Sequence, residues 1–113
     1  MGRPRNQNLI KSIRTTVRLP STLAVRLREL AERNMRSASA EVAFAMARYI
    51  ESGEPAPNPP HWEPGTLEPI NMVFPADIYD RLREMAFNAR RSVNQEIVLA
   101  VERHIAENGG GTS

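Results

Sequence analysis

The sequence has no cysteine, few aromatic residues and no long apolar run. Without cysteine the chain can form neither a disulfide nor a thiolate-ligated metal site, which fits a reducing compartment. The longest unbroken apolar run, Val42 to Ala47, is far shorter than the ~20 residues that span a bilayer. The N-terminus also lacks the apolar region of a secretion signal. We therefore expect a cytoplasmic protein that has no contact with a membrane.

Lysine is almost absent, because Lys11 is the single lysine and the other basic residues are arginines. The planar fork of donors on arginine suits phosphate groups and guanine edges. Residues 1–20 carry five basic residues and no acid, whereas residues 53–69 carry three glutamates and no base. This distribution favours an anionic partner for the N-terminal part of the chain, although a solvated tail explains the basic terminus equally well.

The sequence offers no residues for catalysis. It contains neither a nucleophile–base–acid set nor a glycine-rich phosphate loop. The only histidines, His61 and His104, have no cysteines or paired acids beside them, so they predict no metal site. We interpret His104 as a helix-packing residue. We expect a protein that is not an enzyme, with no cofactor and no small-molecule ligand.

The chain contains an internal duplication with an offset of 55 residues. When Pro20 is placed over Pro75, twelve residues between positions 20 and 50 match without a gap. The matches include the run Arg26–Glu29 over Arg81–Glu84. They also include Arg36, Ser37, Glu41, Ala45 and Arg48, which fall over Arg91, Ser92, Glu96, Ala100 and Arg103. Each copy is too small to enclose a core by itself.

Each copy reads as one strand followed by two helices. Residues 13–19 alternate, with Arg14, Thr16 and Arg18 on one face, and this period of two predicts a strand that Pro20 ends. Ser21 is then predicted to cap a helix with one leucine stripe, and Ser37 begins a second helix that stops at Gly53. Residues 69–74 and the segment after Pro75 repeat this plan.

The expected domain organisation follows from these elements. It comprises a flexible basic arm (1–12), the first copy (13–52), a proline-rich linker (53–67), the second copy (68–108) and a disordered tail (109–113). A single strand leaves its backbone groups unpaired, so the two strands are expected to pair. We predict a mostly α fold with a short two-stranded antiparallel ribbon, formed as an intramolecular pseudo-dimer with four helices beneath the ribbon.

A strand that ends in proline, followed by two helices and the segment Arg91–Ile97, resembles the ribbon-helix-helix (MetJ/Arc) superfamily. The first copy has the looser form Arg36–Val42. The similarity is greatest to Arc-like members, and two copies in one chain resemble TraY-type conjugation proteins. It covers about 80 residues, which is everything except the arm, the linker and the tail.

The resemblance implies a double-stranded DNA partner, with the ribbon in the major groove and the start of each second helix on phosphate. The residues that it implies for contact with bases are Arg14, Thr16, Arg18, Asn71 and Val73. Those that it implies for contact with phosphate are Ser37, Ser39, Ser92 and Asn94, which would also cap the helices, together with Arg3, Arg5 and Lys11 from the arm.

The sequence departs from the family pattern at two kinds of position. Arc-like proteins bury an Arg–Glu–Arg triad. Here the third member of the triad falls on Ala45 and Ala100, which predicts only a pair, Arg36–Glu41 or Arg91–Glu96, in each copy. Where the family often has glycine in the turn between the helices, the sequence has Met35 and Arg90. We therefore expect Asn34 or Asn88 to adopt the left-handed conformation instead.

The resemblance implies a sequence-specific DNA-binding protein that acts as a transcriptional repressor, encoded by a bacterium, phage or plasmid and associated with the nucleoid when bound. Several chains could associate with one another on the DNA. An accessory factor of plasmid conjugation or partition is the alternative, and neighbouring genes would distinguish it. An antitoxin fits less well, because the segment after the second copy is short. An interaction module that has lost DNA binding is a further alternative, which the uncharged second strand favours and which salt-dependent binding to a duplex would test.

Overall fold

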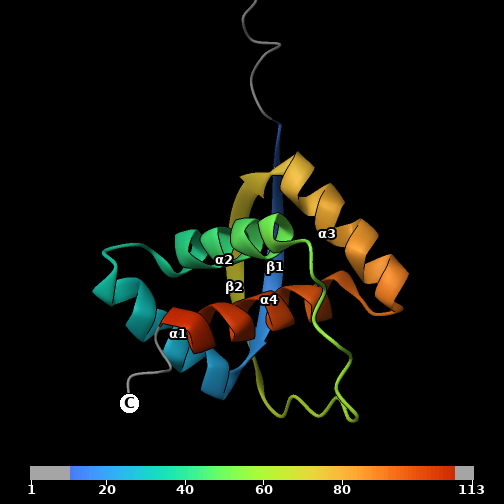
Figure 1. The fold of residues 1–113 in the computed structure, drawn as a ribbon. Coiled ribbons are helices and arrows are strands. Elements are labelled where there is room, and N and C mark those ends of the chain that lie inside the picture. Colours follow the sequence, from blue (N-terminus) through green and yellow to red (C-terminus); the bar gives the residue numbers. More distant parts are fainter. Residues whose placement is uncertain (1–10, 109–113) are drawn as a thin grey trace, which may run out of the picture.

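The computed structural model describes residues 11–108, which form a small sheet and four helices (Figure 1). Arg3 and Arg5 lie outside the described residues. The elements in chain order are β1 (Ser12–Pro20), α1 (Ser21–Arg33), α2 (Ala38–Ser52), β2 (Leu67–Pro75), α3 (Ala76–Ala89) and α4 (Val93–Asn108). The protein is thus mostly helical with one two-stranded antiparallel sheet, as the sequence predicts.

The two strands pair with each other along their whole length, with Thr16 opposite Asn71 at the centre. Their apolar residues alternate with exposed ones, so that one face of the ribbon is buried. The buried residues are Val17, Leu19, Ile70, Met72 and Phe74. Both strands end in proline, which cannot continue the ladder. The period of two in the sequence therefore predicted both strands and their buried face correctly.

The helices cover the buried face with the apolar stripes that the sequence predicts. Leu27 of α1 and Leu82 of α3 are fully buried, as are Met46 of α2 and Val101 of α4. The second helices α2 and α4 contact each other, and each also contacts the strand of the other copy, α2 against β2 and α4 against β1. In Figure 1 both helices lie across the two strands. This crosswise packing makes one shared hydrophobic core.

The helix ends differ from two expectations. Ser21 is the first residue of α1 and does not cap it; its hydroxyl donates to the carbonyl oxygen of Thr66 at 3.2 Å. The left-handed residues of the turns are Met35 (φ 58°) and Arg90 (φ 61°), not Asn34 or Asn88. At each turn one residue just after the helix must adopt the left-handed conformation, so that the amide of the next residue can bond to a carbonyl of the last helical turn. Its place in the turn decides which residue this is, whatever its side chain. Arg91 N–H bonds to Ala86 O at 3.0 Å in this way.

The linker between the copies is held against the helices. Gly53 ends α2 in the left-handed conformation (φ 70°). Beyond it, Ala56 N–H donates to the hydroxyl of Tyr49 at 2.7 Å, and the Asn58 amide group donates to Ala89 O at 3.0 Å. No helix within residues 11–108 has the length and apolar character needed to cross a membrane.

Candidate nucleic-acid interface

The outer face of the ribbon brings the predicted base-contacting residues together. Arg14, Thr16 and Arg18 of β1 are exposed, as are Asn71 and Val73 of β2. In the antiparallel register Arg14 lies opposite Val73, while the Thr16 hydroxyl donates to Asn71 Oδ1 at 3.1 Å. The alternation of the strands thus places all five side chains on one surface, which we call the ribbon face.

The ribbon face carries positive charge without any acid. The single acidic residue in the two strands is Glu68, whose position in the alternation puts it with the inward residues. Its carboxylate pairs with Arg28 of α1 at 2.7 Å, so its charge is matched away from the ribbon face. Arg14 and Arg18 therefore present guanidinium donors on a surface to which neither strand contributes an acid. Such a surface suits a polyanion.

Asn94, near the start of α4, forms hydrogen bonds with the edge of β1. The backbone N–H of Arg18 donates to Asn94 Oδ1 at 2.8 Å, and Asn94 Nδ2 donates to the carbonyl oxygen of Arg18 at 2.9 Å. Ser21 N–H donates to Thr66 O and Ala76 N–H to Lys11 O, and in this register Arg18 is at a non-hydrogen-bonded position, so its backbone N–H and C=O point away from β2. The amide of Asn94 therefore takes the place of a neighbouring strand and fixes the backbone from which the Arg18 side chain projects.

This role for Asn94 differs from the cap that the sequence suggested. The serines do cap their helices as predicted: Ser37 Oγ accepts from Ala40 N–H and Ser92 Oγ from Gln95 N–H, each at 3.0 Å. Gln95 returns the bond by accepting from Ser92 N–H at 3.0 Å, which makes a capping box. The start of α4 thus lies beside the ribbon, where its amides and dipole favour an anion.

The two remaining residues suggested for phosphate contact lie in the described part of the chain. Ser39 is half-buried near the start of α2, and Lys11 is exposed just before β1.

Beneath the ribbon, Glu96 is fully buried and belongs to a group of three side chains. Arg91, itself only 3% exposed, donates to both carboxylate oxygens through Nε and Nη2. The third member is Tyr49 of the other copy, whose hydroxyl donates to Glu96 Oε2 at 2.7 Å. Burial first, and the bond to Glu96 second, raise the pKa of Tyr49, so this hydroxyl keeps its proton. The pair that was expected is therefore a triad completed across the repeat.

Glu41 is arranged in the corresponding way in the other half. Arg36 Nη1 donates to Glu41 Oε1 at 3.0 Å, and His104 of the second copy lies 2.8 Å from Oε2 through Nε2. Because Asn108 Nδ2 approaches His104 Nδ1 at 3.2 Å as a donor, the ring proton belongs on Nε2, facing Glu41. His104 is thus a hydrogen-bonding member of a buried group, more than the packing residue that the sequence suggested.

Stability should depend on pH through Glu41. Burial alone would raise its pKa, but bonds from His104, Arg36 and Asn34 and the charge of Arg36 outweigh burial and lower the pKa below 4.5. A lowered pKa in the folded state means that the stabilisation is complete above about pH 4.5 and is lost as the pH falls through the lowered value. Urea unfolding between about pH 3 and pH 7 should show this loss. Glu41→Gln should flatten the acid limb, and an equally steep limb in that variant would contradict the assignment.

Sequence patterns could not reveal Tyr49, His104 and Asn94 as structural partners, because their contacts join residues 47, 63 and 76 positions apart. The sequence did contain one signal of the contacts of Tyr49 and His104. Tyr49 and His104 occupy matching places in the two copies, on the inner faces of helices that each bury one glutamate.

Comparison of the chain with family models, with curated proteins and with solved structures finds no match. Within residues 11–108, no cluster of three or more histidine, aspartate or glutamate side chains is arranged to hold a metal ion.

Proposed function

We propose that this chain is a tandem ribbon-helix-helix protein that binds double-stranded DNA in a sequence-specific manner, as a transcriptional repressor. The observation that carries the proposal is the ribbon face, an acid-free strip of Arg14, Thr16, Arg18, Asn71 and Val73 that lies over a packed hydrophobic core. A two-stranded ribbon fits the major groove, where every base pair displays its own pattern of donors and acceptors.

The side chains of the ribbon face match the chemistry of base edges. Arginine can donate two bonds to guanine, asparagine pairs with adenine, and the isopropyl group of Val73, half-exposed here, can pack on a thymine methyl. The bond from Thr16 to Asn71 leaves the Asn71 Nδ2 donors available for a base. Asn94 adds precision, because it bonds the Arg18 backbone at the edge of β1.

The ribbon face is asymmetric, with both arginines on β1 and uncharged residues on β2. If the two copies act as an intramolecular pseudo-dimer, a single chain has no true two-fold axis. We therefore propose that one chain occupies a non-palindromic subsite and that several chains line up on direct repeats. A conjugation or partition accessory factor would use the same face, and the genes beside the coding sequence would tell it from a repressor.

Arg14→Ala and Arg18→Ala test this function. Each should weaken binding to a duplex selected from a random pool by ~1–3 kcal/mol and relax specificity at one position, which is the effect of losing a bidentate base contact. Fluorescence anisotropy at fixed salt measures the affinity, and circular dichroism should stay unchanged because both side chains are exposed.

Arg26→Ala is the matched control, because Arg26 is exposed on α1, outside the ribbon, and its loss removes the same charge. It should alter affinity much less than either ribbon variant. If the ribbon variants bind the selected duplex as tightly as the parent, or if no duplex is enriched, the proposed function is wrong.

A further inference from the structure

Within residues 11–108, the two most exposed large apolar side chains lie where one helix turns into the next. Met35 is 92% exposed in the turn between α1 and α2, and Phe87 is 82% exposed at the end of α3, just before the turn to α4. We call residues 32–35 the first corner and residues 87–90 the second corner. Figure 1 shows the two turns on opposite sides of the molecule. Neither side chain belongs to the hydrophobic core, so the fold of one chain gives no reason for them.

The two corners match in the repeat, but their chemistry is exchanged. The first position is Glu32 in one corner and Phe87 in the other, and the fourth position is Met35 in one and Arg90 in the other. Each corner thus has one charged and one apolar side chain, in opposite order. Glu32 and Arg90 are exposed, and neither forms an ion pair with a described residue.

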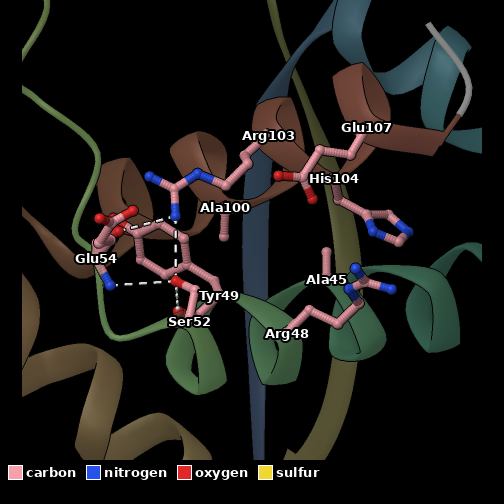
Figure 2. A pocket seen from close by; sticks show the side chains of 9 residues that line it. All are labelled: Ala45, Arg48, Tyr49, Ser52, Glu54, Ala100, Arg103, His104 and Glu107. Atoms are coloured by element: carbon pink, nitrogen blue, oxygen red, sulfur yellow. Dashed lines mark hydrogen bonds between the residues drawn. The ribbon is translucent and has the colours of Figure 1, made fainter. Parts of the chain in front are cut away.

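The contacts between the copies are reciprocal. A cavity of about 300 Å³ lies between α2 and α4, and Ala45 and Ala100, which match in the repeat, both line it (Figure 2). Arg48 and Arg103, which also match, lie at its opposite ends. Each copy likewise bonds to the buried glutamate of the other. Such reciprocity is what the proposed pseudo-dimer requires, because an approximate two-fold axis then relates the copies and their corners.

Chains that line up on direct repeats all face the same way, so the first corner of one chain meets the second corner of the next. If a two-fold axis relates the corners within each chain, a second approximate axis relates the corners that meet between chains. An interface of this kind pairs positions reciprocally. When the first position of one corner faces the fourth position of the other, the two pairs are Glu32 with Arg90 and Met35 with Phe87.

We propose that the first corner of one chain docks on the second corner of a second copy of the chain. An ion pair between Glu32 and Arg90 lies there beside a contact of the Met35 sulfur with the Phe87 ring, a favourable combination of groups. Contacts between like corners would leave both glutamates without a base or both arginines without an acid. The inference rests on the proposed function, because DNA is what places the chains side by side.

The contact is small, so we expect it to act only between neighbouring chains on DNA. Two pairs of side chains bury far less than the roughly 1,200 Å² of a stable interface. Binding to adjacent subsites raises the effective concentration of one chain around the other to about the millimolar range. An exposed ion pair and one sulfur–aromatic contact should then give roughly tenfold cooperativity.

Duplexes that carry one subsite, or two in direct repeat, test the contact at fixed salt. The parent should bind the second subsite about tenfold more tightly than a single one. Two subsites in inverted repeat, which bring like corners together, should show no such gain. Met35→Ala and Phe87→Ala should lose most of the cooperativity but keep the affinity for one subsite. Glu51→Arg, a charge reversal at an exposed residue near the end of α2, should keep both.

A charge exchange separates the contact from effects on folding or on DNA contacts. Glu32→Arg leaves a base at both corners, and Arg90→Glu leaves an acid at both, so each variant alone should bind the two subsites independently. An equimolar mixture of the two variants should regain the cooperativity, because every corner of one variant then faces the opposite charge on the other.

The inference is overturned, with the proposed function intact, if the parent binds one subsite but shows no cooperativity on two, or if the mixture behaves like either variant alone. If no duplex is bound, the proposed function fails and the free chain decides the contact. Its ¹⁵N spectra should then shift at both corners between about 0.1 and 2 mM, and Met35→Ala should abolish the shifts. Spectra that do not change with concentration would overturn the contact in that case.

Discussion

Replacement of Glu96 by alanine is expected to lower the free energy of unfolding by about 3–5 kcal/mol, the effect of breaking a buried ion pair. The carboxylate is fully buried and accepts from Arg91 and from Tyr49. Without it, the Arg91 guanidinium, 3% exposed, would keep its charge in the interior, and among residues 11–108 only Asn58 and Tyr49 would still bond to it. The cost comes mainly from that uncompensated charge, because an unpaired ion loses the solvation that water would provide.

Two variants sharpen this measurement by denaturant unfolding. Glu96→Gln keeps the shape and can still accept through its amide oxygen, so it should cost less than the alanine. Glu84→Ala is the matched surface control, because Glu84 is 69% exposed on its side chain and lies 3.9 Å from Arg81. Exposed pairs of this kind contribute ~0–1 kcal/mol. If Glu96→Ala and Glu84→Ala have similar effects, the carboxylate of Glu96 is solvated and the buried triad is wrong.

The proposed DNA binding gives a second readout for Glu96→Ala. Glu96 is fully buried beneath the ribbon and so cannot touch a duplex directly. Affinity should therefore fall only to the extent that the folded fraction falls, and it should recover in conditions that restore folding. This pattern would distinguish Glu96 from Arg14 and Arg18, for which we expect weaker binding with unchanged folding.

The sequence was sufficient for the ribbon and for the inner faces of the helices, because both follow from local periodicity. Alternation at residues 13–19 and 69–74 defined which side chains are buried in the strands. Because neither copy could pair its single strand alone, the duplication predicted that the two strands pair with each other. The same alternation determines the ribbon face, so its five residues could be named before the structure was known.

The contacts that cross between the copies could not be predicted in the same way. A serine cap is local, and Ser37 and Ser92 were correctly predicted. The bonds of Tyr49 and His104 to glutamates depend on how α2 crosses α4, which no local pattern encodes. Met35 and Arg90 show the same limit, because the requirement of the turn for a left-handed residue outweighed the preference of asparagine for that conformation.

Cutting the linker of the folded protein should lower its stability by about 4 kcal/mol at ~1 μM. A short linker gives a tethered partner an effective concentration of about 1 mM, some thousandfold higher, and each tenfold difference corresponds to about 1.4 kcal/mol. The strands pair with each other and α2 and α4 pack crosswise, so most contacts between the elements join the two copies. A protease site inserted between Pro60 and His61, both exposed, would cut the chain away from the bonds made by Ala56 and Asn58.

The uncut insertion variant is the control, and its urea midpoint should match that of the parent and stay the same from about 1 to 100 μM, as for any single-chain fold. After cutting, the midpoint should rise with concentration, because folding then requires two pieces to associate. Sedimentation should show the uncut chain as a monomer. A concentration-dependent midpoint before cutting, or an obligate dimer of intact chains, would mean that like copies pair between chains. The ribbon would then regain a two-fold axis, and under the proposed function it would select inverted repeats.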